Sequence, residues 1–357
     1  MLRQTKLGAL RLASATGLSR LLRDSSWRQQ RLLILGYHGV ARYDEHEWDP
    51  QLYITRERLR RRLQLLVRER CNVLPLGEAV VRLQSGTLPP RAVTITFDDG
   101  YQDFYSVAFP LIESFGFPVT LYLTTYYVKY NRPVFNLMCR YLLWKGRLQQ
   151  SLRWPEVFPV PCAVDSVAGR GAALAAIKGF ALSRNLSAPG KDRLLARLAE
   201  RLDIDYEDLC QRRVLHLVTS AEAKALATRG LDLEYHTHRH RVHQGRAGTL
   251  VELDDNRRVL ETCTTERPQH FCYASGSYLP EHLEYLAAYG IRSATTCFRG
   301  LCTARTHPLL LPRLIDTMAV SDLEFRAWLA GTASLLPRRA QTMDEGQLVQ
   351  DLTSLAV

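Results

Sequence analysis

Short runs of apolar and β-branched residues alternate along the chain with longer stretches whose apolar residues recur every three or four positions. The short runs predict buried strands and the longer stretches predict amphipathic helices. Because strands and helices alternate, we expect a parallel sheet with crossover helices. The predicted strands are Leu32–Leu35, Asn72–Leu74, Ala92–Phe97, Phe117–Leu123, Leu231–Tyr235, His270–Tyr273, Ile291–Thr296 and Leu309–Ile315.

About eight strands in one α/β chain predict a (β/α) barrel, complete or distorted, with seven or eight parallel strands. Capping signals place several of the helices between the strands. The signals are Thr55 before a leucine-bearing helix, Thr219 with Glu222 and a stop at Gly230, Thr249 with Glu252, Pro280 with a stop at Gly290, and Ser321 with Glu324.

The segment from Tyr130 to Val214 interrupts the alternation, because it is mostly helical and contains a proline-rich stretch. We interpret residues 130–214 as a helical insertion between two strands of a barrel that covers residues 31–331. Residues 1–30 form a separate N-terminal segment and residues 332–357 a C-terminal tail.

The N-terminal segment is basic, nearly free of acidic residues and moderately rich in leucine, but no apolar run in it is long enough to span a bilayer. Such a segment is typical of an amphipathic helix on an anionic membrane, and equally of a helix that caps the domain. A transit peptide is a third interpretation.

The net charge of the 357-residue chain is +11, which favours polyanionic partners. An RNA-binding aromatic signature and zinc-finger spacing are both absent from the sequence, which argues against nucleic acid as a partner. The eight cysteines contain no C-x-x-C pair, so we expect a reducing compartment. The sequence thus predicts a cytoplasmic protein with a peripheral contact at the inner face of the membrane.

A pair of adjacent carboxylates follows the predicted strand Ala92–Phe97, in the motif Thr96-Phe97-Asp98-Asp99-Gly100. Like charges at a strand end repel unless a cation compensates them. Asp-Gly is also a common turn pair, so the motif alone fits a surface turn equally well.

Histidines cluster directly after the strand Leu231–Tyr235, in His236-Thr237-His238-Arg239-His240. The spacing of His236 and His240 suits two imidazoles that bind one ion, whereas His238 points elsewhere. His243 forms a competing pair with His240, and a histidine-rich surface loop is the bland alternative.

Both motifs follow predicted parallel strands, whose carboxyl ends converge on one face of a barrel. Two histidines and one carboxylate leave open positions on a zinc-like ion, as in a catalytic site. The second carboxylate is then free to act as a base towards water.

These two motifs resemble those of the polysaccharide deacetylase family (NodB homology, carbohydrate esterase family 4), whose pattern is T-F-D-D-G followed by H-[ST]-x-x-H. The resemblance implies a distorted (β/α) barrel and a metal-dependent hydrolase that removes N-acetyl groups from amino sugars. It implies a divalent metal bound by Asp99, His236 and His240, with Asp98 as the general base. The expected metal is zinc.

Three further site residues follow from the same resemblance. Tyr37-His38-Gly39-Val40 is similar to the Tyr-His-x-Val motif of a subgroup in which this early histidine is the general acid. Arg313 resembles a family arginine near the site, and its expected role is either a bidentate pair that orients Asp98 or a structural salt bridge. Ser275 is the expected backbone donor of the oxyanion hole. It lies in Phe271–Gly276, a segment that lacks the proline and the second tyrosine of the corresponding family motif.

The predicted substrate is an N-acetylated glycan. The alternatives are a deacylase or deformylase of a lipid-linked amino sugar, and a barrel that binds glycans without turnover. The intact Asp98 and His38 argue against the last of these.

Overall fold

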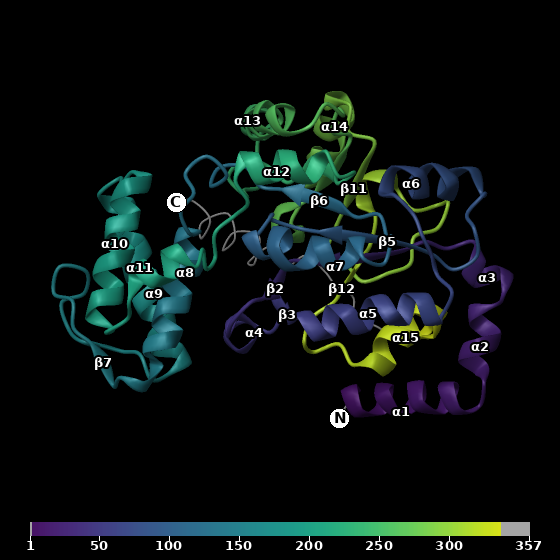
Figure 1. Cartoon of the computed structure of the whole chain (residues 1–357), viewed down its shortest axis with the longest axis horizontal. Helices are drawn as coiled ribbons and strands as arrows, with labels where there is room; N and C mark the ends of the chain where they lie inside the picture. Colours follow the sequence, from purple (N-terminus) through teal and green to yellow (C-terminus); the bar gives the residue numbers. More distant parts are fainter. Residues whose placement is uncertain (1, 337–357) are drawn as a thin grey trace. The chain divides into compact units, whose positions relative to one another are not determined.

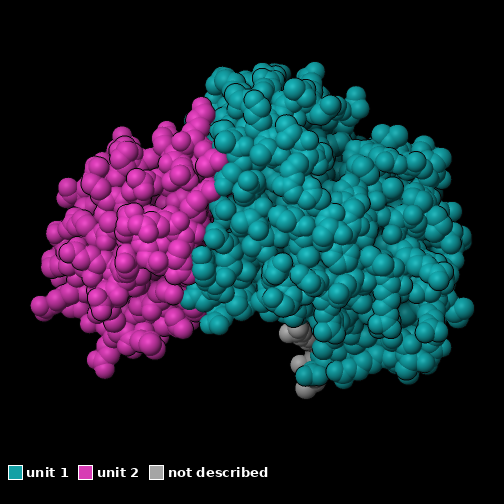
Figure 2. Space-filling model, viewed as in Figure 1, with its two compact units in different colours: residues 1–126, 220–353 teal, residues 127–219, 354–357 magenta. Residues whose placement is uncertain are grey.

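The computed structural model describes residues 2–336 and divides the chain into two compact units, which Figure 2 shows in different colours. Among the described residues, the first unit contains those up to Tyr126 and residues 220–336, and the second unit is Tyr127–Thr219. Most of the predicted C-terminal tail, residues 337–357, lies outside the described residues.

A sheet of eight parallel strands forms the centre of the first unit (Figure 1). Its order is β11-β10-β9-β6-β5-β1-β12, and β4 pairs with β5 beside this path. Each of the eight predicted runs overlaps one of these strands, and β1 extends two residues beyond its predicted end at Leu35. They are β1 (Leu33–Tyr37), β4 (Asn72–Val73), β5 (Ala92–Phe97), β6 (Thr120–Leu123), β9 (Asp232–Tyr235), β10 (His270–Cys272), β11 (Ser293–Thr295) and β12 (Leu314–Ile315).

The two ends of this strand order are joined by one segment of chain. Thr295 of β11 forms a parallel bridge with Leu311, and β12, three residues further on, pairs with β1. Pro312 lies between them and has no N–H group for a continuous ladder. The sheet therefore curls into a distorted (β/α) barrel, as predicted.

Helices of the first unit surround the strands (Figure 1). The Thr55 hydroxyl caps α5 by accepting from the Arg58 amide at 3.1 Å, and Ser321 with Glu324 forms a capping box on α15. The predicted start at Thr249 is wrong, because α13 begins at Arg246. The helices are α5 (Arg56–Arg68), α6 (Leu76–Ser85), α7 (Phe109–Glu113), α12 (Ser220–Ala227), α13 (Arg246–Cys263), α14 (Pro280–Tyr289) and α15 (Asp322–Ala330).

Shorter elements between β1 and β6 were not predicted, because they carry too few residues for a periodic pattern. They include the two-stranded sheet of β2 (Gly39–Ala41) and β3 (Tyr53–Thr55), the helix α4 (Glu45–Trp48) and a π-helix, η1 (Phe104–Ala108).

The N-terminal segment folds into α1 (Leu2–Ala15), α2 (Leu18–Arg23) and α3 (Ser26–Gln29), and the first two pack against α15 (Figure 1). The Arg28 guanidinium is buried and donates to the carbonyls of Leu329 at 2.8 Å and Arg31 at 2.6 Å. These contacts fit the interpretation of a capping segment. Within residues 2–336, no helix is both long and apolar enough to cross a membrane.

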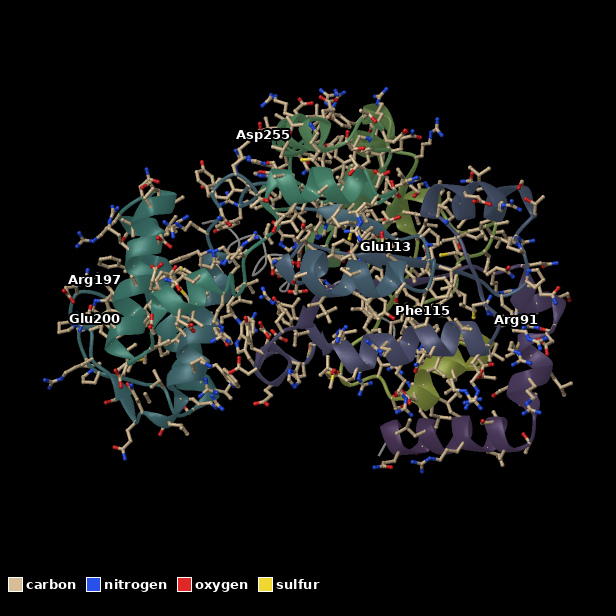
Figure 3. All side chains as sticks on the ribbon, viewed as in Figure 1. Arg91, Glu113, Phe115, Arg197, Glu200 and Asp255 are labelled. Carbon is tan, nitrogen blue, oxygen red and sulfur yellow. The ribbon has the colours of Figure 1, made fainter. Side chains whose placement is uncertain are left out.

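The second unit interrupts the chain between β6 and β9 and is mostly helical, with one antiparallel hairpin. Trp154 is 1% exposed in its core, with the guanidinium groups of Arg197 and Arg201 at 5.4 and 5.2 Å from its ring centre (Arg197 is labelled in Figure 3). Its elements are α8 (Phe135–Lys145), η2 (Gly146–Leu148), β7 (Ser151–Leu152), β8 (Cys162–Ala163), α9 (Val167–Ser183), α10 (Ala188–Arg201) and α11 (Tyr206–Gln211).

Candidate active site

The register of the sheet brings polar residues together at the carboxyl ends of its strands. β1 and β5 pair Tyr37 with Phe97, so His38 and Asp98 leave the sheet side by side. The pairing of Phe271 with Tyr235 likewise places the end of β10 beside the end of β9. The residues after these strands therefore share one layer, where (β/α) barrels build their active sites.

Asp99, His236 and His240 converge at this face. The Asp99 Oδ1 atom lies 3.2 Å from His236 Nε2 and 3.3 Å from His240 Nε2. Tetrahedral zinc with ligand bonds near 2.0–2.1 Å separates its donor atoms by about 3.3 Å. Two imidazole nitrogens and one carboxylate oxygen at these separations fit a divalent cation. Three protein ligands would leave coordination positions on the cation open, as in a catalytic site.

The turn at Asp98-Asp99-Gly100 directs the two carboxylates to different partners. Asp99 adopts a left-handed conformation, with φ of 69°, and the Gly100 amide donates to the Asp98 carbonyl at 2.8 Å. Asp99 thereby faces the histidines while Asp98 faces the buried Arg313. The adjacent carboxylates can thus have separate functions.

Hydrogen bonding and burial prepare the histidines as ligands. His236 Nδ1 lies 2.8 Å from the Cys272 carbonyl and must donate to it, which directs Nε2 towards Asp99 and a cation. Against the effect of burial, Cys272 and Asp99 raise the pKa of this ring above its ordinary value, so a cation would take the place of the proton on Nε2. Burial lowers the pKa of His240 to about 4 against the opposing effect of Asp99, so this ring is neutral near pH 7. Neutral imidazole is the form that binds metal.

Asp98 forms a bidentate ion pair with Arg313, and both side chains are almost fully buried. The Nη1–Oδ1 and Nη2–Oδ2 distances are 2.7 and 2.8 Å. Burial alone would raise the pKa of Asp98, but the Arg313 charge and hydrogen bonds outweigh burial and lower it to about 2. Asp98 is therefore ionised at neutral pH.

The Arg313 guanidinium is itself held by the barrel. Its Nε donates to the Thr296 carbonyl at 3.0 Å, and Nη1 also donates to the Thr96 hydroxyl at 3.1 Å. Nη2 lies 3.1 Å from Cys272 Sγ. Asp98, His236 and Cys272 also lie close enough to share an ion, but the positive charge of Arg313 against two of them disfavours a cation there.

Of the two other predicted site residues, His38 lies beside this cluster, whereas Ser275 forms no hydrogen bond with its described residues. His38 Nε2 lies 3.6 Å from Asp98 Oδ2, and the ring is 19% exposed, so it borders both the carboxylate and solvent. Ser275 lies in a turn after β10, η3 (Ala274–Gly276), with φ of 56°. None of the hydrogen bonds within the described cluster involves Ser275, so its role as an oxyanion donor stays a prediction.

The remaining histidines near the motifs have other partners. His238 Nδ1 lies 2.8 Å from the Thr125 hydroxyl, and His243 Nε2 lies 3.6 Å from Glu252. His307 caps the 3-10 helix η4 (Pro308–Leu310) by accepting from the Leu309 amide. His236 and His240 are thus the two histidines that face Asp99.

The structure adds residues that the sequence interpretation missed. Thr124, at the end of β6, donates its amide to the Asp99 carbonyl at 3.2 Å and its hydroxyl to the His236 carbonyl at 3.1 Å, which ties the two motifs together. Asn256 and Glu252 of α13 bind backbone amides of the histidine loop. The sequence offered two signals for them. Thr124 is a polar residue directly after a predicted strand, and Glu252 and Asn256 are polar residues on the apolar face of a helix.

Comparisons with known proteins agree with this geometry. The family model described as polysaccharide deacetylase matches residues 85–151 and 195–294. A poly-beta-1,6-N-acetyl-D-glucosamine N-deacetylase of Escherichia coli (strain K12) is 30% identical over 99 residues, which are 28% of this chain and 14% of that protein. The match thus spans about a seventh of this curated relative.

Two solved structures share the fold of the chain. The deacetylase PplD of Streptococcus pyogenes, in complex with acetate, has a TM-score of 0.54 and 17% identity over 82% of this chain and 96% of that one. IcaB from Ammonifex degensii has a TM-score of 0.53 and 16% identity over 84% of this chain and 97% of that one. The two motifs, the barrel and the family-model match agree, and together they make this chain similar to the polysaccharide deacetylases.

Proposed function

We propose that the protein is a metal-dependent hydrolase that removes N-acetyl groups from amino sugars of a glycan. One observation carries the proposal: three ligands, Asp99, His236 and His240, converge beside a separate ionised carboxylate, Asp98, which has a histidine within 3.6 Å. A barrel that only bound glycans would not require this second pair of groups. The family and the name of the curated relative support the acetamide as the bond attacked.

A divalent cation held by the three ligands would polarise the acetamide carbonyl and acidify a bound water. Asp98, kept ionised by Arg313, accepts the proton of the attacking water. A carboxylate with so low a pKa is a weak base, so it holds this proton only briefly. His38 is placed to carry a proton towards the leaving amine, and the amide of Ser275 to donate to the oxyanion.

We further propose that the chain belongs to the subgroup with the early Tyr-His-x-Val motif, which the position of His38 beside Asp98 supports. Its substrate would be an N-acetylated oligosaccharide or polysaccharide, and the products acetate and a free amine. The alternative within hydrolases is a lipid-linked amino sugar that loses an acyl or formyl group. The two alternatives differ in the product acid and in whether the substrate carries a lipid.

Acetate release from a panel of N-acetylated oligosaccharides and lipid-linked sugars tests this proposal. We expect activity that a chelator abolishes and Zn²⁺ restores. His236→Ala and His240→Ala should each reduce bound metal sharply, because two ligands hold zinc far less tightly than three. His238→Gln is the matched control, since this ring faces Thr125. Unchanged metal content in both alanine variants would refute the ligand assignment.

We also propose that the N-terminal helices contact an anionic membrane. Leu12, Leu18 and Leu21 are 66%, 54% and 74% exposed. Arg11 and Arg20 are exposed beside them. Apolar and basic side chains together favour anionic lipid. Leu12→Ser with Leu21→Ser should abolish sedimentation with vesicles of anionic lipid at low salt, without loss of fold. A wild-type protein that ignores such vesicles would leave these helices with the capping role alone.

A further inference from the structure

Two polar side chains lie on the buried face of α13, four residues apart and therefore on one side of the helix. Glu252 is 2% exposed and Asn256 is fully buried. Their neighbours on this face are the buried apolar residues Leu253, Val259 and Leu260. Burial of a carboxylate and an amide is unfavourable unless specific partners compensate them.

The partner of Glu252 is the residue before the ligand His240. Its Oε2 accepts from the Arg239 amide at 2.7 Å, and its Oε1 accepts from Arg239 Nη1 at 2.9 Å. The same guanidinium lies 2.9 Å from Asp255, which is labelled on α13 in Figure 3. Glu252 therefore fixes both the backbone and the side chain of Arg239.

Asn256 holds the other end of the same loop. Its Oδ1 accepts from the His236 amide at 3.0 Å. Its Nδ2 donates to the Leu123 carbonyl at 3.0 Å and to the Thr125 hydroxyl at 2.9 Å, both at the end of β6. Asn256 thus connects the start of the histidine loop to the neighbouring strand.

The loop between these two anchors has an unfavourable backbone conformation. Thr237 and His240 have φ of 63° and 54°, in the left-handed region that residues with a Cβ rarely adopt. Thr237 is also β-branched, which makes this conformation more costly. Such residues persist where the surrounding structure fixes them, and here α13 supplies contacts at both ends of the loop, in addition to those of Thr124 and Thr125.

We propose that Glu252 and Asn256 are positioning residues that set the metal affinity of the site by holding the loop His236–His240 in its binding conformation. The inference rests on the proposed metal site and goes beyond it, since neither side chain faces the ligand atoms. Without either anchor, part of the metal-binding free energy would be needed to order the loop. Metal affinity should then fall while the barrel remains folded.

The test is the dissociation constant for Zn²⁺, measured on the full chain by competition with a chromophoric chelator. Glu252→Ala and Asn256→Ala should each raise it about 10–100-fold, the range usual for partners that orient metal ligands. Glu252→Gln and Asn256→Asp keep one acceptor for the loop amide and should recover part of the affinity. Glu261→Gln is the matched control, because Glu261 lies on the same helix with 58% of its side chain exposed.

Two further measurements separate positioning from a general loss of fold. Thermal unfolding of the metal-free variants should show a cooperative transition, and the Arg239 amide should exchange its hydrogen faster in Glu252→Ala than in the control. If the alanine variants do not fold, the Gln and Asp variants decide the question. Wild-type protein without Zn²⁺ binding would refute the metal site and this inference together. Tight wild-type binding with unchanged constants in all Glu252 and Asn256 variants would overturn this inference alone.

Discussion

An Asp98→Asn variant should keep its bound metal and lose on the order of 10²–10⁴-fold in turnover. The amide has nearly the same shape as the carboxylate but cannot accept a proton from the attacking water. Asp98 is not among the three converging ligands, so the cation should stay. Initial rates of acetate release and metal content, measured on the same preparation, check both halves of this expectation.

Asp103→Asn is the matched control for this substitution. Asp103 is buried five residues further on, and its Oδ1 accepts from the Val40 amide at 2.7 Å, a bond that asparagine can keep. This variant should remain within a few-fold of wild-type turnover. Near-normal turnover in Asp98→Asn would show that another group acts as the base.

The role of His38 as the general acid can be tested by the same measurements of turnover and metal content. His38→Ala should retain metal and lose turnover in the same range. The reason is that His38 lies 3.6 Å from Asp98 and is the nearest imidazole outside the ligand set. Near-normal turnover in His38→Ala would transfer the acid function to His307 or His243.

An Arg313→Met variant should lose about 3–5 kcal/mol of unfolding free energy at pH 7, because it leaves a buried carboxylate without its counter-charge. Arg313 and Asp98 are 0% and 2% exposed in their side chains, so solvent cannot replace the lost partner. Methionine fills much of the volume of the arginine chain, which limits the loss from packing. Urea unfolding of the metal-free protein, kept in chelator, measures the difference.

The pH dependence of this loss identifies its cause. In the wild type, the pKa of Asp98 is about 2 in the folded state against 3.8 as the ordinary value, so the pair stabilises the fold above about pH 4, and this contribution is lost as the pH falls towards 2. In Arg313→Met, burial loses its largest opposing influence, so the pKa of Asp98 should rise. The deficit of the variant should therefore shrink as the pH is lowered from 7 towards 4.5.

Arg28→Met is the matched control for the charge. Arg28 is equally buried, but its guanidinium donates to the backbone carbonyls of Leu329, Arg31 and Ala92. Its loss of stability should not depend on pH between 4.5 and 7. A deficit in Arg313→Met that is equally independent of pH would contradict the ion-pair explanation.

The scaffold of this protein could be predicted from local pattern. Continuous apolar runs such as Ala92–Phe97 indicated strands buried on both faces, and all six residues of β5 are buried. The motifs that follow two of these runs placed Asp98, Asp99, His236 and His240 at strand ends. Parallel strands present their carboxyl ends on one face, so the sequence implied that these residues meet.

Other features depended on contacts that no local pattern records. The bond between Arg313 and Asp98 joins residues 215 positions apart, and the register of β12 beside β1 decides it. Barrel closure through Leu311 depends on a single bridge beside Pro312.

Glu252 shows most clearly why the sequence alone was insufficient. Its spacing from Thr249 fits a capping box, yet α13 begins three residues earlier, at Arg246, and the carboxylate binds Arg239 instead. A capping bond and a loop anchor use the same acceptor atoms, so residue type and spacing cannot distinguish them. The packing of α13 against the histidine loop decided which donor this buried carboxylate would meet.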